Sequence, residues 1–356
     1  MQKLPNRALL SAAVAAAVAA LAAPAQAIDV KLSGQINRAV TLADNGTNTD
    51  ALFVDNNNTG TRFRLRGGGE IGGGVEAGVR WETQYNENSS SVIDIGDGDG
   101  GNSDGFVSRY REVWFKGNWG QVYLGQGDGA ANGTSEVDLS GTAYVADYSG
   151  QNLDDGLQFA LADGSGTRET SNGAVFSNFD GLSRNDRLRY DTPTWGGLVL
   201  SGDVGQDKWE VAGRYKAKWT GGQFGAAAGY VGREADAFGT QLGVSASILL
   251  NNGINLSGSY GQQDPDNADA EADGFYAKIG YKFGADQAHA VSVSYNVIND
   301  LELLNDEATR IAGAYVYNIK EHGVELYGLI QNAELDRPGV DIDDVGQISI
   351  GSRIKF

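Results

Sequence analysis

Apolar and polar side chains alternate with a period of two in segment after segment of this chain, and this alternation limits the possible folds more than any other feature. Arg62, Arg64 and Arg66 share one parity, whereas Phe63 and Leu65 share the other. Such alternation predicts a β-strand with one polar and one apolar face. Further segments of this kind lie at 30–42, 75–84, 211–219, 275–283, 310–320 and 347–356. The 52 glycines and 5 prolines suit an all-β chain with many tight turns.

The connections between these segments are of two kinds, which alternate along the chain. Seven are short turns, at 72–73, 118, 194–196, 221–222, 252, 285–286 and 321–322. Eight are mostly longer and acidic, at 43–58, 87–106, 127–183, 207–208, 233–238, 264–272, 300–308 and 336–344. Fifteen alternating connections join sixteen strands. An even number of antiparallel strands, with short turns at one rim and long loops at the other, predicts a sixteen-stranded antiparallel transmembrane β-barrel. Closure of the barrel pairs the backbone groups that would otherwise face lipid.

Charged and aromatic residues follow the same plan. Most of the 46 acidic residues fall in the longer connections, whereas most lysines and arginines fall on strands, at the polar parity. Aromatic residues gather near both strand ends, as the girdles of a membrane barrel do. Arg38, Arg109 and Arg111 depart from this pattern, because they lie at the apolar parity. They predict either a subunit contact on this side of the barrel or a β-bulge that shifts the register.

Residues 1–27 have the three parts of a secretory signal peptide. Lys3 and Arg7 precede an apolar stretch at 8–23, and the small residues Ala25 and Ala27 mark a cleavage site. The remaining residues, 28–356, are expected to form the barrel as a single domain. They contain no run of about 18 apolar residues, which argues against helical membrane spans.

Composition excludes several classes of function. The formal net charge of −19 becomes −21 without Lys3 and Arg7, and such acidity argues against nucleic acid as a partner. The chain has no cysteine, and its two histidines, His289 and His322, both lie beside short turns. Neither histidine is placed to activate a serine or a zinc ion, so we expect neither an enzyme nor a metal or other cofactor.

Four segments resemble the general Gram-negative porins, and the resemblance extends over essentially the whole chain after the leader. They are VKLSGQINRA at 30–39, SRYREVWFKGNWGQVYLGQ at 108–126, RNDRLRYDTPTWGGLVLSG at 184–202 and ISIGSRIKF at 348–356. The resemblance implies a homotrimer of barrels in the outer membrane, which passes small polar solutes and ions by passive diffusion. It also implies that the terminal Phe356 is part of the signal read by the outer-membrane assembly machinery. One departure stands out, because Gln126 follows Gly125 where the family usually has an arginine.

The resemblance also implies that the connection at 127–183 folds into the lumen and narrows it. A connection this long is far beyond the usual length and needs such a role. We expect its acidic residues to line one side of the constriction, namely Asp128, Glu136, Asp138 and Asp147. The polar parity of the early strands places basic residues on the facing wall, namely Arg62, Arg64, Arg66 and Arg80. Opposed charges across a narrow aqueous gap would filter solutes electrostatically.

Some alternatives stay open at the level of sequence. A substrate-selective channel and a non-conducting structural or adhesin barrel are alternatives to a general diffusion porin. The acidic net charge and Gln126 favour cations over anions as the preferred ions. Acidic loop tips, such as the one with Asp94, Asp97, Asp99 and Asp104, are expected to be solvated. Weak binding of divalent cations there, next to lipopolysaccharide phosphates, is an alternative for these tips.

Overall fold

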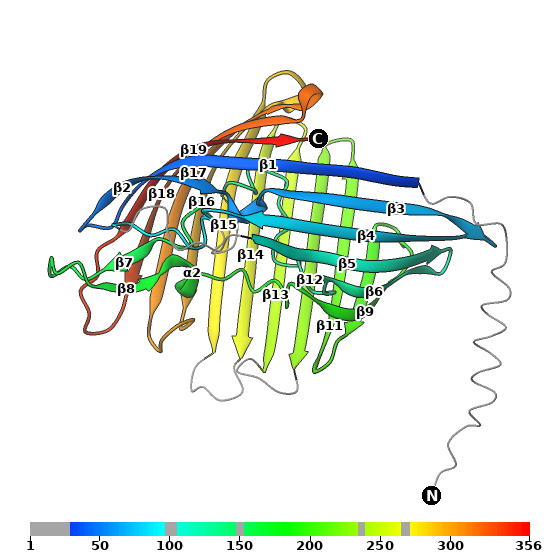
Figure 1. The fold of residues 1–356 in the computed structure, drawn as a ribbon, viewed down its shortest axis with the longest axis horizontal. Helices are drawn as coiled ribbons and strands as arrows, with labels where there is room; N and C mark the ends of the chain where they lie inside the picture. Colours follow the sequence, from blue (N-terminus) through cyan, green and yellow to red (C-terminus); the bar gives the residue numbers. More distant parts are fainter. Residues whose placement is uncertain (1–28, 97–104, 147–152, 234–238, 265–270) are drawn as a thin grey trace, which may run out of the picture.

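The computed structural model describes residues 29–96, 105–146, 153–233, 239–264 and 271–356 (Figure 1). Their strands form a closed antiparallel β-barrel, with each strand beside its neighbours in the sequence. The barrel strands are β1 (Asp29–Asp44), β2 (Thr49–Asp55), β3 (Arg62–Gly72), β4 (Val75–Asn86), β5 (Gly105–Gly117), β6 (Gly120–Asp128), β9 (Arg184–Asp191), β10 (Leu198–Val204), β11 (Lys208–Trp219), β12 (Gly222–Arg233), β13 (Thr240–Leu250), β14 (Ile254–Asp264), β15 (Ala272–Phe283), β16 (His289–Asn299), β17 (Glu307–Ile319), β18 (Val324–Asp336) and β19 (Val345–Lys355). Segments β2 and β3 lie end to end along β1 and act as one barrel strand, so the predicted sixteen strands are confirmed.

The interruption between β2 and β3 differs from the sequence-based expectation of one long loop at 43–58. The chain instead makes a tight hairpin after Asp44, runs back as β2, and breaks at the short 3₁₀ turn η1 (Asn57–Thr59). The side chain of Asn56 accepts a hydrogen bond from the N–H of Asn58, and Asp55 accepts one from Thr61. These local bonds satisfy backbone groups that a continuous strand would pair in its ladder.

The barrel closes between its first and last strands. The register runs from Gln35 opposite Lys355 to Asp44 opposite Gly346. Beyond β19, Gly34 and Phe356 exchange both backbone hydrogen bonds, at 2.8 and 3.0 Å.

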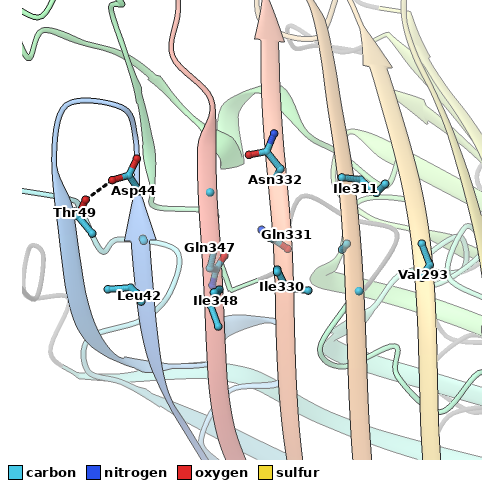
Figure 2. A pocket seen from close by; sticks show the side chains of 14 residues that line it. Leu42, Asp44, Thr49, Val293, Ile311, Ile330, Gln331, Asn332, Gln347 and Ile348 are labelled. Carbon is cyan, nitrogen blue, oxygen red and sulfur yellow. Dashed lines mark hydrogen bonds between the residues drawn. The ribbon is translucent and has the colours of Figure 1, made fainter.

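The outward face carries an apolar band, as the alternation predicts. Figure 2 shows part of it, with Leu42 of β1, Ile348 of β19, Ile330 of β18, Ile311 of β17 and Val293 of β16 on successive strands. A shallow groove of about 610 Å³ crosses these strands over Gly313, which has no side chain to fill it. None of the helices in the described ranges is long and apolar enough to cross a membrane.

The connection between β6 and β9 contains a hairpin and one short helix that are not part of the barrel wall (Figure 1). These elements are β7 (Gln158–Ala160), β8 (Arg168–Ser171) and α2 (Asn172–Val175). Buried apolar residues of this connection, such as Leu157 and Phe159, share a core with inward residues of the wall, such as Ala314 and Leu329. The long connection therefore packs inside the barrel, against one side of it. We call residues 129–183 the inner loop.

Candidate functional site

Four arginines of the early strands surround one buried carboxylate on the lumen wall. The side chain of Glu82 is 0% exposed, and it forms ion pairs with Arg64, with Arg109 at 2.8 Å, with Arg62 at 3.4 Å and with Arg80 at 3.8 Å. The arginines themselves keep between 12% and 28% of their side-chain surface exposed. The group, which we call the arginine cluster, therefore carries a net charge of 4 − 1 = +3 next to the lumen.

Arg109 joins this cluster because of a β-bulge between β4 and β5. Glu82 lies opposite Tyr110, but the next residue, Thr83, lies opposite Ser108, so Arg109 is the extra residue of β5. A bulge inserts one residue and changes the direction of the side chain there. Of the two explanations that the sequence left open for Arg109, the structure therefore supports the bulge.

Arg38 and Arg111 remain on the outward face. Arg38 donates to the carbonyl of Glu87 at 3.1 Å, and Arg111 donates to Oε1 of Gln126 at 2.8 Å. Arg111 lies directly opposite Gln126 in the register of β5 and β6. The departure from the family pattern at Gln126 thus falls on the outer surface, where it removes no charge from the lumen.

Two of the predicted wall arginines, Arg80 and Arg66, differ in how far they are engaged by other side chains. Arg80 stacks on the ring of Tyr110, with Cζ 3.2 Å from the ring centroid, and it also approaches Glu112 at 3.8 Å. Arg66 is exposed and makes neither a hydrogen bond nor an ion pair with any described residue. Of the four arginines predicted to face the lumen, Arg66 is thus the one most available to a solute.

Asp128 stands where β6 leads into the inner loop, at the edge of the arginine side of the lumen. Its carboxylate accepts a hydrogen bond from Tyr110 Oη and lies 3.7 Å from Arg184. Its carbonyl accepts from Arg187 at 2.9 Å and from Arg189 at 3.2 Å. These four residues fix the point at which the chain turns inward.

Glu136 and Asp180 lie together in the inner loop and are half-buried. Glu136 accepts a hydrogen bond from Asn178 at 2.6 Å, and Asp180 accepts one from the N–H of Gly133 at 3.1 Å. Burial raises the pKa of the Asp180 carboxyl above its ordinary value, against the opposing effect of its hydrogen bonds with the Gly133 N–H and the Glu136 side chain. Asp180 therefore carries less negative charge at mildly acidic pH than an ordinary carboxylate would.

Asp138 differs from the expectation that it lines the constriction. Its side chain is 1% exposed, and it lies 2.6 Å from Nζ of the equally buried Lys278 on β15. Burial opposes its ionisation, but the Lys278 ammonium and the Ser140 hydroxyl and N–H hold the pKa of Asp138 below its ordinary value. Asp138 is thus an ionised anchor that fastens the inner loop to the wall.

A second buried pair fastens the inner loop further along. Asp154 lies 3.1 Å from Arg310 of β17, and both side chains are at most 2% exposed. Burial raises the pKa of Asp154, although Arg310 opposes this effect. Asp147, the remaining acidic residue expected at the constriction, lies outside the described residues.

Three side chains of the wall hold the start of the inner loop, namely Asp203 of β10 and Glu210 and Arg214 of β11. Asp203 accepts a hydrogen bond from the N–H of Ala130, and Glu210 accepts one from that of Ala131 at 2.7 Å. Arg214 donates to the carbonyls of Ala130 and Asn132 at 2.7 and 2.6 Å. Sequence reasoning placed Arg214 on the lumen wall but missed its bonds to the inner loop, and it missed the roles of Asp203, Glu210, Glu82, Lys278 and Arg310 altogether. All of them lie on the inward faces of strands, and that parity was the only signal available for them.

At the loop rim, Arg337 bonds three carboxylates from two other connections, the inner loop and the loop between β16 and β17. Its guanidinium lies 2.6 to 2.7 Å from Asp306, Glu302 and Glu169. These hydrogen bonds, led by that of Asp306, raise the pKa of Arg337 further. The hairpin of the inner loop is also paired with the connection after β18, through the Ala162 N–H and the Asp341 carbonyl at 2.9 Å. The inner loop is therefore tied to the rim as well as to the wall.

Within the described ranges, no group of three or more His, Cys, Asp or Glu residues is arranged to hold a metal ion. Of the acidic tip considered above, Asp94 pairs with Arg168 at 2.6 Å. Asp97, Asp99 and Asp104 lie outside the described residues.

Comparisons with known proteins agree with this architecture. A family model described as Gram-negative porin matches residues 10–338. No curated protein sequence matches the chain.

Among solved structures, the anion-selective porin from Comamonas acidovorans is 18% identical with a TM-score of 0.64, and the match covers 93% of this chain and all of that one. The outer membrane channel DcaP of Acinetobacter baumannii is 12% identical with a TM-score of 0.61, covering 94% and 99% of the two chains. The trimer form of OmpT from Vibrio cholerae is 11% identical with a TM-score of 0.59, covering 93% and 100%. At these identities the likeness shows the shared fold alone.

Proposed function

The chain belongs to the Gram-negative porin family, and on this premise we propose that it is a diffusion porin whose arginine cluster makes it prefer anions. Membership of the family makes it an integral β-barrel of the outer membrane, with a water-filled channel for small hydrophilic solutes. The narrow part of the channel, between the arginine cluster and the inner loop, acts as an electrostatic filter.

One observation carries the proposed anion preference, namely the convergence of four arginines on the single carboxylate of Glu82. Two acidic residues of the inner loop do not offset this charge, because Asp138 and Asp154 are buried and paired with cations of the wall. The sequence-based prediction of a cation preference used the net charge of the chain, in which acidic residues of the outer loops count as much as those beside the channel. Charges within a Debye length of the solute path, about 8–10 Å, act most strongly on a passing ion.

We also propose that the protein is a homotrimer. The match to the trimer form of OmpT supports this assembly. The outward polar group of Arg38, Arg111 and Gln126 supports it as well, because charged groups that face lipid are destabilising by about 2–4 kcal/mol at mid-depth. The same proposal includes contact with lipopolysaccharide, and use of the terminal Phe356 by the outer-membrane assembly machinery.

No enzymatic role is part of this proposal. His289 stacks between aromatic rings, 4.5 Å from Tyr317 and 5.1 Å from Phe283, and bonds Tyr315. Such a setting suits a girdle residue at the membrane interface.

The reversal potential of single channels across a salt gradient in planar bilayers tests the proposal. We expect conductance steps, and a reversal potential with the sign that a greater permeability to anions than to cations gives. Arg64→Glu is expected to move the reversal potential toward cations, whereas Lys218→Glu, with the same change of charge at the short-turn rim, is expected to move it much less. Absence of any steps would leave only a structural or adhesin barrel. Equal shifts for the two variants would disprove the assignment of the filter to the arginine cluster.

A further inference from the structure

Three cations lie side by side across neighbouring strands of the lumen wall. Lys31 of β1 is directly opposite Arg66 of β3, and Arg66 is directly opposite Arg80 of β4. Like charges in directly opposed positions destabilise a sheet unless an anion compensates them. Arg80 has Glu82 and Glu112 nearby, but Lys31 and Arg66 make no hydrogen bond or ion pair within the described part of the chain.

These cations border a hollow of about 480 Å³ in the lumen wall. The hollow is also lined by Trp114 of β5 and Tyr123 of β6. Both residues lie at the inward parity of their strands, with Glu112 and Gln121. An aromatic surface and two cations without an ion-pair partner among the described residues, Lys31 and Arg66, therefore share one recess of the lumen wall.

Glycine residues make room for the indole ring against the wall. A Cβ atom at Gly68 would lie 2.9 Å from Cζ2 of Trp114, and one at Gly78 would overlap the ring more closely still. Any larger residue at these positions would push the indole out of place. The ring thus lies over the backbone of β3 and β4, and forms a fixed apolar side of the hollow.

The charge balance of the hollow is positive. Its two carboxylates are Asp29 and Glu112, and Glu112 is already engaged by Arg187 at 2.7 Å. Trp114 lies close to Gly117, the last residue of β5 at the short-turn rim. The hollow is consequently on the short-turn side of the arginine cluster, beyond the filter for a solute that enters from the loop rim.

We propose that this hollow binds aromatic carboxylates in transit, with the ring against Trp114 and the carboxylate on Arg66 and Lys31. This inference rests on the proposed channel function. A guanidinium matches a carboxylate with two parallel hydrogen bonds, and an ammonium adds a point charge. Stacking on Trp114 favours a planar ring over an aliphatic chain. The site would slow such solutes during passage, and a bound solute would obstruct the flow of ions until it leaves.

The probe is benzoate, with acetate as the anion without a ring and benzamide as the ring without a charge. Each is added in the millimolar range on the short-turn side while single-channel current is recorded in planar bilayers. We expect benzoate to interrupt the current at concentrations at least fivefold below those at which acetate or benzamide does. Arg66→Gln and Trp114→Leu are each expected to weaken this block by fivefold or more. Lys218→Gln, which removes one positive charge from another part of the wall, is expected to leave it unchanged.

The outcomes separate this inference from the function beneath it. Channels that conduct normally but respond equally to benzoate and acetate would overturn the inference and leave the porin function intact. Absence of conductance in the unmodified protein would instead remove the porin function. If Trp114→Leu does not fold, Trp114→Phe keeps a flat ring and is expected to retain the block. Arg66→Gln is an independent test, and an unchanged benzoate block in that variant would overturn the inference by itself.

Discussion

The Nε atom of Arg109 lies 2.8 Å from Oε1 of Glu82 on the neighbouring strand. A second donor of the same guanidinium, Nη1, reaches Oε1 of Gln84 at 2.8 Å. The bulge in β5 thus adds a fourth arginine to the arginine cluster, beside Arg62, Arg64 and Arg80. Arg109 and Arg111 are two residues apart, yet one is inside the barrel and the other outside.

This difference between Arg109 and Arg111 can be measured directly. Arg109→Gln removes a charge beside the solute path, so we expect the reversal potential in a salt gradient to move toward cations. Arg111→Gln removes the same charge from the outer surface and is expected to leave the reversal potential where it was. A larger shift for Arg111→Gln would mean that the bulge does not turn Arg109 inward.

Removal of the central carboxylate is expected to destabilise the barrel. In Glu82→Gln, four arginines lose their shared counter-ion, and loss of one partner from a buried ion pair costs about 3–5 kcal/mol. The free energy of unfolding in urea, followed by tryptophan fluorescence in lipid vesicles, gives the measurement. Glu76→Gln is the matched control, because Glu76 is exposed on the same face of β4. A control variant that loses as much stability as Glu82→Gln would contradict the central role of Glu82.

The pair of Asp138 and Lys278 gives a prediction for the mobility of the inner loop. Asp138→Asn leaves the Lys278 ammonium without a counter-ion in a buried site, so the docked loop is expected to lose about 3–5 kcal/mol. We expect larger fluctuations of the open-channel current and faster cleavage of the loop by added protease. The double variant Asp138→Leu with Lys278→Met removes both charges, and its open-channel current is expected to fluctuate less than that of the single variant. A double variant as noisy as the single one would show that the ion pair is not what matters.

Asp180 gives a prediction for pH. Because burial raises its pKa above the ordinary 3.8, this carboxyl binds a proton earlier than an exposed one as the pH falls. Its negative charge is then lost beside the lumen, so the preference for anions is expected to rise as the pH is lowered from 7 toward 4. Reversal potentials at a series of pH values provide the test.

Two variants identify the titrating group. Asp180→Asn is expected to show the stronger anion preference already at neutral pH. It is also expected to lose the part of the response that comes first as the pH falls from 7, before ordinary carboxyls bind protons. Asp163 is an exposed carboxyl of the same loop, and hydrogen bonds from Ser165 lower its pKa. Asp163→Asn is therefore expected to keep the profile of the unmodified protein. A full early response in Asp180→Asn would show that another group titrates.

Local rules were sufficient to predict the barrel itself. The alternation of Phe63 and Leu65 with the arginines fixes which face of β3 meets lipid, and the turn at 72–73 fixes where β4 begins. Each short turn and long loop could be located in the same way, because glycine, asparagine and aspartate mark them independently of tertiary contacts. The break at Asn56 was missed, since it depends on hydrogen bonds between residues that also suit an open loop.

The site was less predictable because it depends on partners that are far apart in sequence. Asp138 and Lys278 are separated by 140 positions, and no local sequence pattern around either residue indicates that the two form a pair. An inward carboxylate can line the lumen or neutralise a cation, and parity alone does not distinguish these outcomes. For Arg109 the sequence left a subunit contact and a β-bulge open, because one inserted residue reverses the side-chain direction that parity assigns and only the strand pairing reveals it.

The pairing of β1 with β19 has a consequence for how the molecule is made. The two segments that meet at the seam are far apart in the sequence, and Thr41 and Ser349, which share a hydrogen bond there, are separated by 308 positions. Until they meet, each has a free row of backbone donors and acceptors that any other strand can capture. Contacts between such distant segments also form slowly. The barrel can therefore close only after both segments have been made, and until then their free edges must be kept from pairing with other strands.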